Sequence, residues 1–175
     1  MADFYKTKEM SQFSDEEWEM ICMRCGKCCM NKYGDETSVI FSNLMCRNFD
    51  LKRSCCSCYE NRLSSSCVKV DLELLKNNIN LLPHTCAYRL LYEGKGLPEF
   101  HPLITEDVNS VIKARETVAF LDVFSEKDLS DALMELHERE ARENWDEEKF
   151  EKEEAKIFDK FKIKPIYIYP LVPKK

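Results

Sequence analysis

The stretch ICMRCGKCCM places four of the chain's cysteines close together, at Cys22, Cys25, Cys28 and Cys29. The chain has ten cysteines in 175 residues, more than packing alone would need. Three of the four are spaced at i, i+3 and i+6, so their thiolates can converge if the backbone curls, and Gly26 lacks the Cβ that would crowd such a turn. Structural zinc sites and iron–sulfur sites both use C-x₂-C spacing. The spacing therefore predicts metal–thiolate chemistry.

The identity of the remaining ligands is left open by the spacing. A ferredoxin run would continue with a cysteine at position 32, which is lysine, so the fourth ligand must come from elsewhere. Cys86 is our first choice, because it follows Pro83 at the start of a predicted helix, where a thiolate is favoured. Cys28 and Cys29 are adjacent and serve either two neighbouring metals or one metal with a spare thiol. The sequence lacks the strand and long helix that flank a thioredoxin-like C-x-x-C pair.

Composition restricts the function further. The first 20 residues contain no apolar signal region, and no window is long and apolar enough to span a bilayer, so we expect a cytoplasmic, soluble protein with reduced thiols. The net charge is −6, which argues against nucleic-acid binding. Residues 126–164 contain 14 acidic and 9 basic residues, so this segment holds most of the imbalance with a net charge of −5.

Periodicity and capping signals predict the elements. Ser14 and Glu17 form a capping box that opens a short helix ending near Cys22. Apolar spacing predicts helices over 70–82 and from 85 to about 93, and residues 116–124 have the composition of a strand. Residues 30–69 hold few long apolar runs, so we expect bound metal to organise them.

The C-terminal part is predicted from charge and aromatic content. Ser125 and Asp128 are the capping signal of a long charged helix. Trp145, Phe150 and Phe161 give this helix more aromatic surface than a fully solvated helix needs. We expect its second half to pack against protein. The final segment, KPIYIYPLVP, is expected to add a strand or strap to the domain carrying residues 116–124, or to mediate dimerisation.

Two blocks of the sequence carry a family resemblance. SDEEWEMICMRCGKCC and LLPHTCAYRLLYEGKGLPEFHPL resemble the YkgJ-type cysteine-cluster (CxxCxxCC) proteins, in particular the YcgN-like branch, described as zinc- or iron-chelating. The resemblance covers roughly residues 11–135. It implies cysteine positions of the family at Cys22, Cys25, Cys28, Cys29, Cys46, Cys67 and Cys86, and a C-x-C pair whose alignment falls on Ser54 and Cys56 or on Cys56 and Cys58.

The resulting prediction is a small α+β domain organised by metal, with short helices, irregular cysteine-rich segments, a little β-strand and a charged C-terminal helix. Its expected division is a cysteine-cluster domain over 1–135 and an acidic helical extension over 136–175. The predicted metal ligands are Cys22, Cys25, Cys28, Cys29, Cys46, Cys56, Cys58, Cys67 and Cys86. The expected cofactor is an iron–sulfur cluster or zinc.

Two other functions stay open beside plain metal binding. One is a structural zinc module that presents its acidic helix to a protein partner. The other is a cluster-dependent redox or group-transfer enzyme, although no catalytic residue is singled out and no glycine-rich methyl-donor loop is present. His101 precedes a proline and is expected to cap a turn more readily than to bind metal. Arg89 and Glu93 are expected to pair on a solvated helix face.

Overall fold

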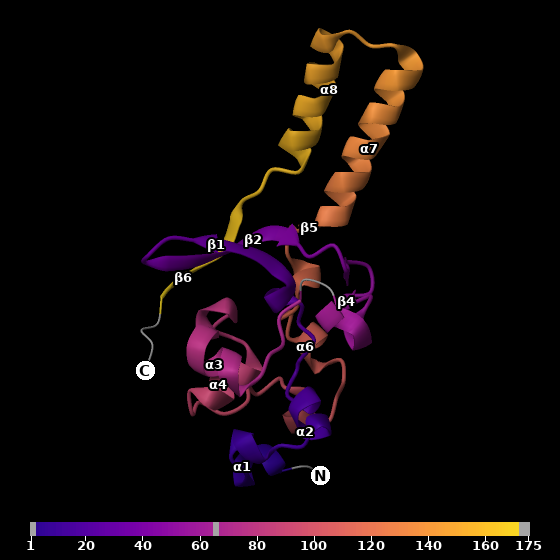
Figure 1. The fold of residues 1–175 in the computed structure, drawn as a ribbon. Helices are drawn as coiled ribbons and strands as arrows, with labels where there is room; N and C mark the ends of the chain where they lie inside the picture. Colours follow the sequence, from indigo (N-terminus) through magenta and orange to yellow (C-terminus); the bar gives the residue numbers. More distant parts are fainter. Residues whose placement is uncertain (1–2, 65–66, 172–175) are drawn as a thin grey trace.

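The structure is a computed structural model and describes residues 3–64 and 67–171. Its strands are β1 (Met30–Gly34), β2 (Ser38–Met45), β3 (Phe49–Asp50), β4 (Cys55–Cys56), β5 (Phe124–Ser125) and β6 (Pro165–Pro170). Its α-helices are α1 (Phe4–Thr7), α2 (Asp15–Met20), α3 (Leu72–Asn78), α4 (Ala87–Tyr92), α5 (Pro102–Thr105), α6 (Ser110–Lys113), α7 (Glu126–Glu143) and α8 (Glu147–Lys160). Its 3₁₀ turns are η1 (Met10–Gln12), η2 (Lys27–Cys29), η3 (Tyr59–Ser64), η4 (Ile79–Leu81) and η5 (Val118–Phe120). This mixture confirms a small α+β fold (Figure 1).

Strand β2 is the centre of the main sheet. It pairs antiparallel with β1 along one edge, antiparallel with β6 over Ser38–Ser42, and parallel with β5 at Leu44 and Met45. Strands β3 and β4 form a separate two-stranded ladder. The C-terminal segment thus returns to a strand near the middle of the chain and completes the sheet.

Two hydrophobic clusters hold the body of the protein. The first packs side chains from the N-terminal helices against α3, α4 and α6, with Ile21, Leu75 and Tyr88 among its buried members. The second lies on the sheet and contains Phe41 and Met45, both fully buried. Cys22, Cys25 and Cys86 border the first cluster, whereas Cys29 borders the second. The segment from Cys22 to Cys29, which we call the cysteine loop, therefore lies where the two clusters meet.

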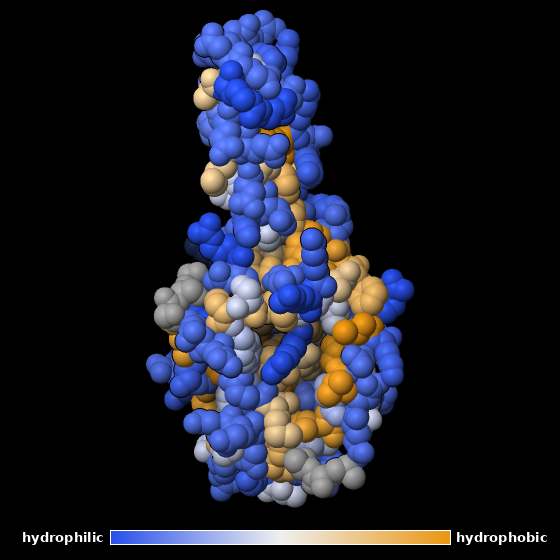
Figure 2. Space-filling view, turned by 90° about the vertical axis from the view of Figure 1, so that its right-hand side faces the viewer, coloured by the Kyte–Doolittle hydropathy of each residue, from blue (hydrophilic) through white to orange (hydrophobic). Residues whose placement is uncertain are grey.

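Helices α7 and α8 form an antiparallel hairpin that projects from the body (Figure 1). Figure 2 shows that the projecting arm is mostly hydrophilic, whereas hydrophobic surface lies on the body. Phe161 is buried at the base of the arm and contacts the ring of Phe124. Asn43 fastens the chain beyond α8, because its backbone and side chain bond the backbone of residues 162 and 164.

Several local predictions are confirmed. The backbone N–H of Glu17 donates to Ser14 Oγ at 3.2 Å, and the Glu17 carboxylate accepts from the Ser14 N–H at 2.9 Å, which is the predicted capping box of α2. Ser125 and Asp128 form the same box at the start of α7. Helices α3 and α4 lie within the predicted ranges. Strand β6 is the predicted extended C-terminal segment, and its partner is β2.

Three predictions are wrong in part. Residues 116–124 contain the 3₁₀ turn η5 and contribute only Phe124 to a strand. Val118, in this turn, is fully buried and packs beneath the cysteine loop. The single long charged helix is two helices, since Asn144 takes a left-handed φ of 51° and Asp146 caps α8. Residues 30–45 form a hairpin whose side chains pack in the second hydrophobic cluster, so this part of the middle region has the apolar core that the prediction of a metal-organised segment denied it.

The predicted division at residue 135 falls inside α7, which runs from Glu126 to Glu143. Strand β6 lies in the predicted extension and pairs with β2 in the predicted cysteine domain.

Candidate metal centre

The loop that carries the first cysteines begins where α2 ends. Arg24 and Gly26 both take positive φ, at 53° and 77°, so the chain coils back on itself between Cys22 and the turn η2. A Cβ on Gly26 would lie 2.5 Å from Phe49 Cζ and 2.7 Å from Val118 Cγ2. The backbone of Val118 also donates to the carbonyl of Cys25 at 3.0 Å. Glycine is thus required here both by the turn and by the side chains packed beneath it.

Cys22, Cys25, Cys28 and Cys86 form what we call the first thiol set. Cys25 interacts electrostatically with the other three, although Cys86 comes from the distant N-cap of α4. Burial raises the pKa of Cys22 to about 11 and that of Cys86 to about 12, and the neighbouring thiols raise both further. Burial and the same neighbours also raise the pKa of Cys25. Low-dielectric surroundings disfavour thiolates, so an added positive charge would relieve that cost.

Cys29, Cys46, Cys56 and Cys67 form the second thiol set. Cys29 interacts electrostatically with Cys46 and Cys56, and Cys67 interacts with the same two residues. The backbone N–H of Cys46 donates to the carbonyl of Cys29 at 2.8 Å, and this bond holds the backbones of Cys29 and Cys46 side by side. Cys58 lies beside it, with its Sγ 3.8 Å from Cys56 Sγ.

Cys28 connects the two sets. Its side chain is hydrogen-bonded to that of Cys29, and this bond lowers the pKa of Cys28 to about 6 while raising the pKa of Cys29. Lys32 and Arg62 add positive charge that favours the Cys28 thiolate. Cys28 is also exposed, unlike Cys22 and Cys25. It is therefore the most acidic and accessible thiol of the loop.

Positive side chains surround the loop, and the sequence-based reasoning missed them. Lys27 is 5% exposed, and its ammonium is 2.5 Å from the Glu116 carboxylate. Burial is the largest single influence on Lys27 and lowers its pKa, but the bond with Glu116 and the charges of Tyr167, Glu116 and Cys25 together outweigh burial, so the pKa is raised. Lys32 donates to the carbonyls of Cys28 and Met30 at 2.7 and 2.9 Å. Burial lowers the pKa of Lys32, and Cys28 and Cys29 act against this by stabilising its charge.

Tyr59 and Arg62 fasten the 3₁₀ turn η3 to α2. The Tyr59 hydroxyl donates to a carboxylate oxygen of Glu19, and Arg62 donates to the other at 2.9 Å. The guanidinium groups of Arg24 and Arg62 lie 5.5 and 4.0 Å from the Tyr59 ring centroid. Since Glu19 precedes Cys22 closely and η3 follows Cys58, this contact holds the two thiol sets together. Local sequence gave no signal for it, because the partners are far apart in the chain.

His101 positions the loop. It is fully buried and caps α5, with its Nδ1 accepting from the Leu103 N–H at 3.1 Å. Its Nε2 therefore carries the proton and lies 3.0 Å from the carbonyl of Ile21. Both nitrogens are used, so the predicted capping role is confirmed.

Arg89 departs from the prediction of a solvated helix face. It does pair with Glu93, at 2.8 Å, but it is 1% exposed and also donates to the carbonyl of Leu82 at 2.9 Å. Arg89 therefore ties α4 to the chain that leads into Cys86.

All ten cysteines are free thiols in the structure. Within residues 3–64 and 67–171, no three or more His, Cys, Asp or Glu side chains are arranged so that they could hold a metal ion as they stand. The chemistry of the donor set nevertheless fits a thiophilic metal, because each set provides four sulfur atoms and carboxylates are absent from both. Cys55, in β4, lies outside the two sets.

The fold and the loop define a small α+β protein in which Cys22, Cys25, Cys29 and Cys86 border two hydrophobic clusters. The chain is 41% identical to a UPF0260 protein of Vibrio parahaemolyticus over 119 residues, which are 66% of this chain and 81% of that protein. It is 44% identical to the UPF0260 protein YcgN of Escherichia coli over 106 residues, which are 58% of this chain and 69% of YcgN. The chain belongs to the UPF0260 family.

No family model matches the chain. No solved structure matches it either. None of the helices in the described part of the chain has the length and apolar character needed to cross a bilayer.

Proposed function

We propose that this protein binds a metal centre through its cysteine thiolates, as an iron–sulfur cluster or as zinc. The observation that carries the proposal is the first thiol set, in which Cys86 interacts with Cys22 and Cys28 from a distant part of the chain. Three of these thiols have raised pKa values, so a bound cation would favour the thiolates over the thiols. Within this proposal Cys22, Cys25, Cys28 and Cys86 hold the metal.

The second thiol set supports a second centre beside the first. Cys29, Cys46, Cys56 and Cys67 supply four further thiols, and Cys58 is a fifth within reach of Cys56. This division explains how adjacent residues can both be ligands: Cys28 belongs to one set and Cys29 to the other. Either centre would supply thiolate–metal chemistry, structural for zinc and redox-active for iron–sulfur.

The surrounding cations suit such a centre. A metal with four thiolates carries net negative charge, and Lys27, Lys32 and Arg62 lie around the loop to offset it. We also place the protein in the cytoplasm, because ten free thiols persist in a reducing compartment.

Optical absorption and metal analysis of the anaerobically purified full-length chain test the proposal. An iron–sulfur protein is expected to be brown and to contain iron and sulfide, whereas a zinc protein is colourless. Protein that takes up neither iron nor zinc under reducing conditions would refute metal binding.

A second candidate function is a structural zinc module for a protein partner. The projecting α7–α8 arm favours it, because the arm is acidic and solvated on most faces (Figures 1 and 2). A colourless zinc protein whose metal is unchanged when residues 130–157 are replaced by a short linker would support this reading. A brown protein would favour the redox-active centre.

A further inference from the structure

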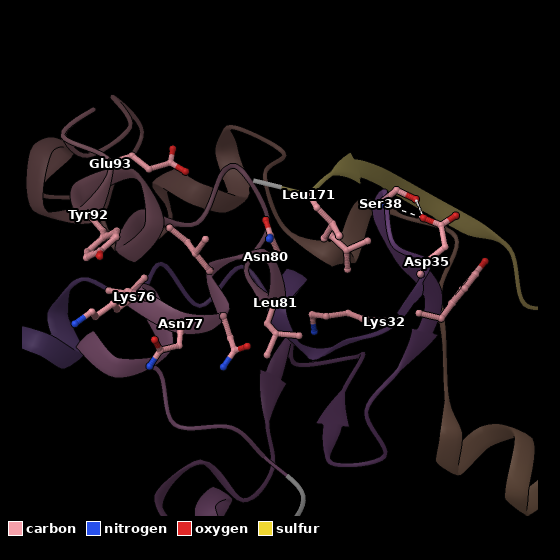
Figure 3. Close-up of a pocket in the computed structure, with 16 residues that line it drawn as sticks. Lys32, Asp35, Ser38, Lys76, Asn77, Asn80, Leu81, Tyr92, Glu93 and Leu171 are labelled. Atoms are coloured by element: carbon pink, nitrogen blue, oxygen red, sulfur yellow. Dashed lines mark hydrogen bonds between the residues drawn. The ribbon is translucent and has the colours of Figure 1, made fainter. Parts of the chain in front are cut away.

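A cavity of about 410 Å³ lies between the β1–β2 hairpin and the α3–η4 segment (Figure 3). The end of α4 and Leu171, just beyond β6, complete its wall. Its volume falls within the range typical of sites for small organic molecules. Both thiol sets lie outside its lining, so the proposed metal ligands do not account for it.

Much of the cavity wall is aliphatic. Val39 comes from β2, Leu75 from α3, and Ile79 and Leu81 from η4. Leu81 is 37% exposed and borders the opening. In Figure 3 the Lys32 side chain extends toward Leu81, with its nitrogen at the nearer end. An occupant therefore meets apolar side chains along this wall and the Lys32 side chain beside it.

The carboxylates that line the cavity are already engaged. Asp35 accepts from the backbone N–H groups of Thr37 and Ser38, at 2.7 and 2.9 Å, and closes the hairpin turn. Glu93 is ion-paired with Arg89 at 2.8 Å and with Lys95 at 2.6 Å. Neither acid is left to attract a cationic ligand.

The donors that line the cavity are less engaged. Among the described residues, the side chains of Lys76, Asn77 and Asn78 have no hydrogen-bond or ion-pair partner. The Lys32 ammonium has three N–H donors, and its two bonds to the carbonyls of Cys28 and Met30 leave one. The charged groups available to a ligand are therefore the two lysine ammonium groups, beside the amides of Asn77 and Asn78, which can donate or accept.

We propose that this cavity binds a carboxylate carried on a short apolar chain. The aliphatic wall accommodates the chain, and the ammonium groups of Lys32 within and of Lys76 at the exposed rim are the cations available to the carboxylate. Because Lys32 also interacts with Cys28 and Cys29, the occupant would lie next to the thiol sets. The inference goes beyond metal binding: Lys32 is shared with the proposed metal centre, but no cavity residue is a proposed metal ligand.

Calorimetric titration of the full-length protein with octanoate tests the inference, with 1-octanol and octylamine as neutral and cationic probes of equal chain length. Octanoate is expected to bind about tenfold more tightly than either. Equal binding of octanoate and 1-octanol, or no octanoate binding up to its solubility limit, would overturn the proposal.

Two variants locate the binding. Leu81→Asp places a negative charge on the wall and is expected to weaken octanoate binding at least about tenfold. Lys76→Gln removes the unpaired cation at the rim and should weaken octanoate without affecting 1-octanol. Met134→Asp, at an exposed position on α7, is the control and should bind as the parent does. Unchanged octanoate affinity in both cavity variants would contradict the assignment.

Discussion

At Gly26 the backbone turns with φ 77° directly above Phe49 and Val118. The cysteine spacing predicted this tight turn, because a glycine among three converging cysteines has few other uses. It could not predict the residues beneath the turn, since Phe49 and Val118 lie far away in the chain. The same holds for the Lys27–Glu116 pair, whose partners are 89 positions apart.

Alanine at Gly26 tests the turn. Gly26→Ala is expected to lower the free energy of unfolding by about 1 kcal/mol for the positive φ and by a further 1–3 kcal/mol, roughly, for the clash with Phe49 and Val118. Gly94→Ala is the matched control, because Gly94 has φ 74° and nothing within 4 Å of the added Cβ. Urea unfolding of both variants measures the difference. Equal midpoints would show that the loop does not pack as described.

Alkylation of the metal-free protein tests the acidity of Cys28. The folded-state pKa of about 6 keeps Cys28 ionised at neutral pH, whereas Cys22 and Cys86, at about 11 and about 12, stay protonated. Iodoacetamide should therefore modify Cys28 first, with a rate that falls as the pH drops through about 6. Mass spectrometry of the labelled peptides measures this. A Cys28 rate that rises only above about pH 8, as for a free thiol, would contradict the Cys28–Cys29 pairing.

At the scale of the elements, local signals predicted helices better than strands. The capping boxes at Ser14 and Ser125 and the apolar spacing of 70–82 involve residues that lie within one or two helical turns of each other. Such signals can be recognised in the sequence. The β1–β2 hairpin was not predicted, because strand pairing depends on contacts across the sheet and not on local sequence. Residues 116–124 were assigned to a strand on composition alone. The break between α7 and α8 occurs at Asn144, which takes a left-handed conformation. The sequence has no glycine or proline there that would predict it.

Adjacent substitutions in β6 test its place in the sheet. The Tyr169 ring lies 4.0 Å from the His84 ring and 5.5 Å from the Phe41 ring, measured between centroids. Tyr169→Ala should lower the free energy of unfolding by about 2 kcal/mol. Ile168 points to the other face and is 60% exposed, so Ile168→Ala should cost less than about 0.5 kcal/mol. Chemical denaturation distinguishes the two, and the reverse order would place β6 in the wrong register.

On the scale of the whole molecule, the two hydrophobic clusters meet at the cysteine loop, and the α7–α8 arm lies apart from them. The sequence predicted the charged extension and the packing of its second half, Phe150 to Phe161, against protein. Phe161 is buried at the base of the arm, but Phe158 is 51% exposed and no residue of α8 is buried, so this prediction is confirmed only at Phe161. The sequence did not predict the second hydrophobic cluster, which lies on the sheet around Phe41. Metal removal should therefore loosen the loop and the helical cluster beside it without melting the arm.

The two tryptophans report on these parts separately. Trp18 donates to the carbonyl of Val70 at 2.7 Å and contacts Tyr88 in the first cluster, whereas Trp145 lies at the tip of the arm. With Trp145→Phe, chelation should shift tryptophan emission to longer wavelength, because Trp18 becomes solvated. With Trp18→Phe, the emission should stay unchanged. Equal responses in the two variants would show that the arm and the body do not respond separately.

The central claim, a metal held by thiolates from distant parts of the chain, is tested most directly by the metal content of Cys86→Ser. Cys86 joins the first thiol set from α4, and Cys55 lies outside both sets, so Cys55→Ser is the matched control. We expect metal per chain to fall sharply in Cys86→Ser and to equal that of the parent in Cys55→Ser, both purified anaerobically. Full metal stoichiometry in the Cys86→Ser protein would contradict the proposed site.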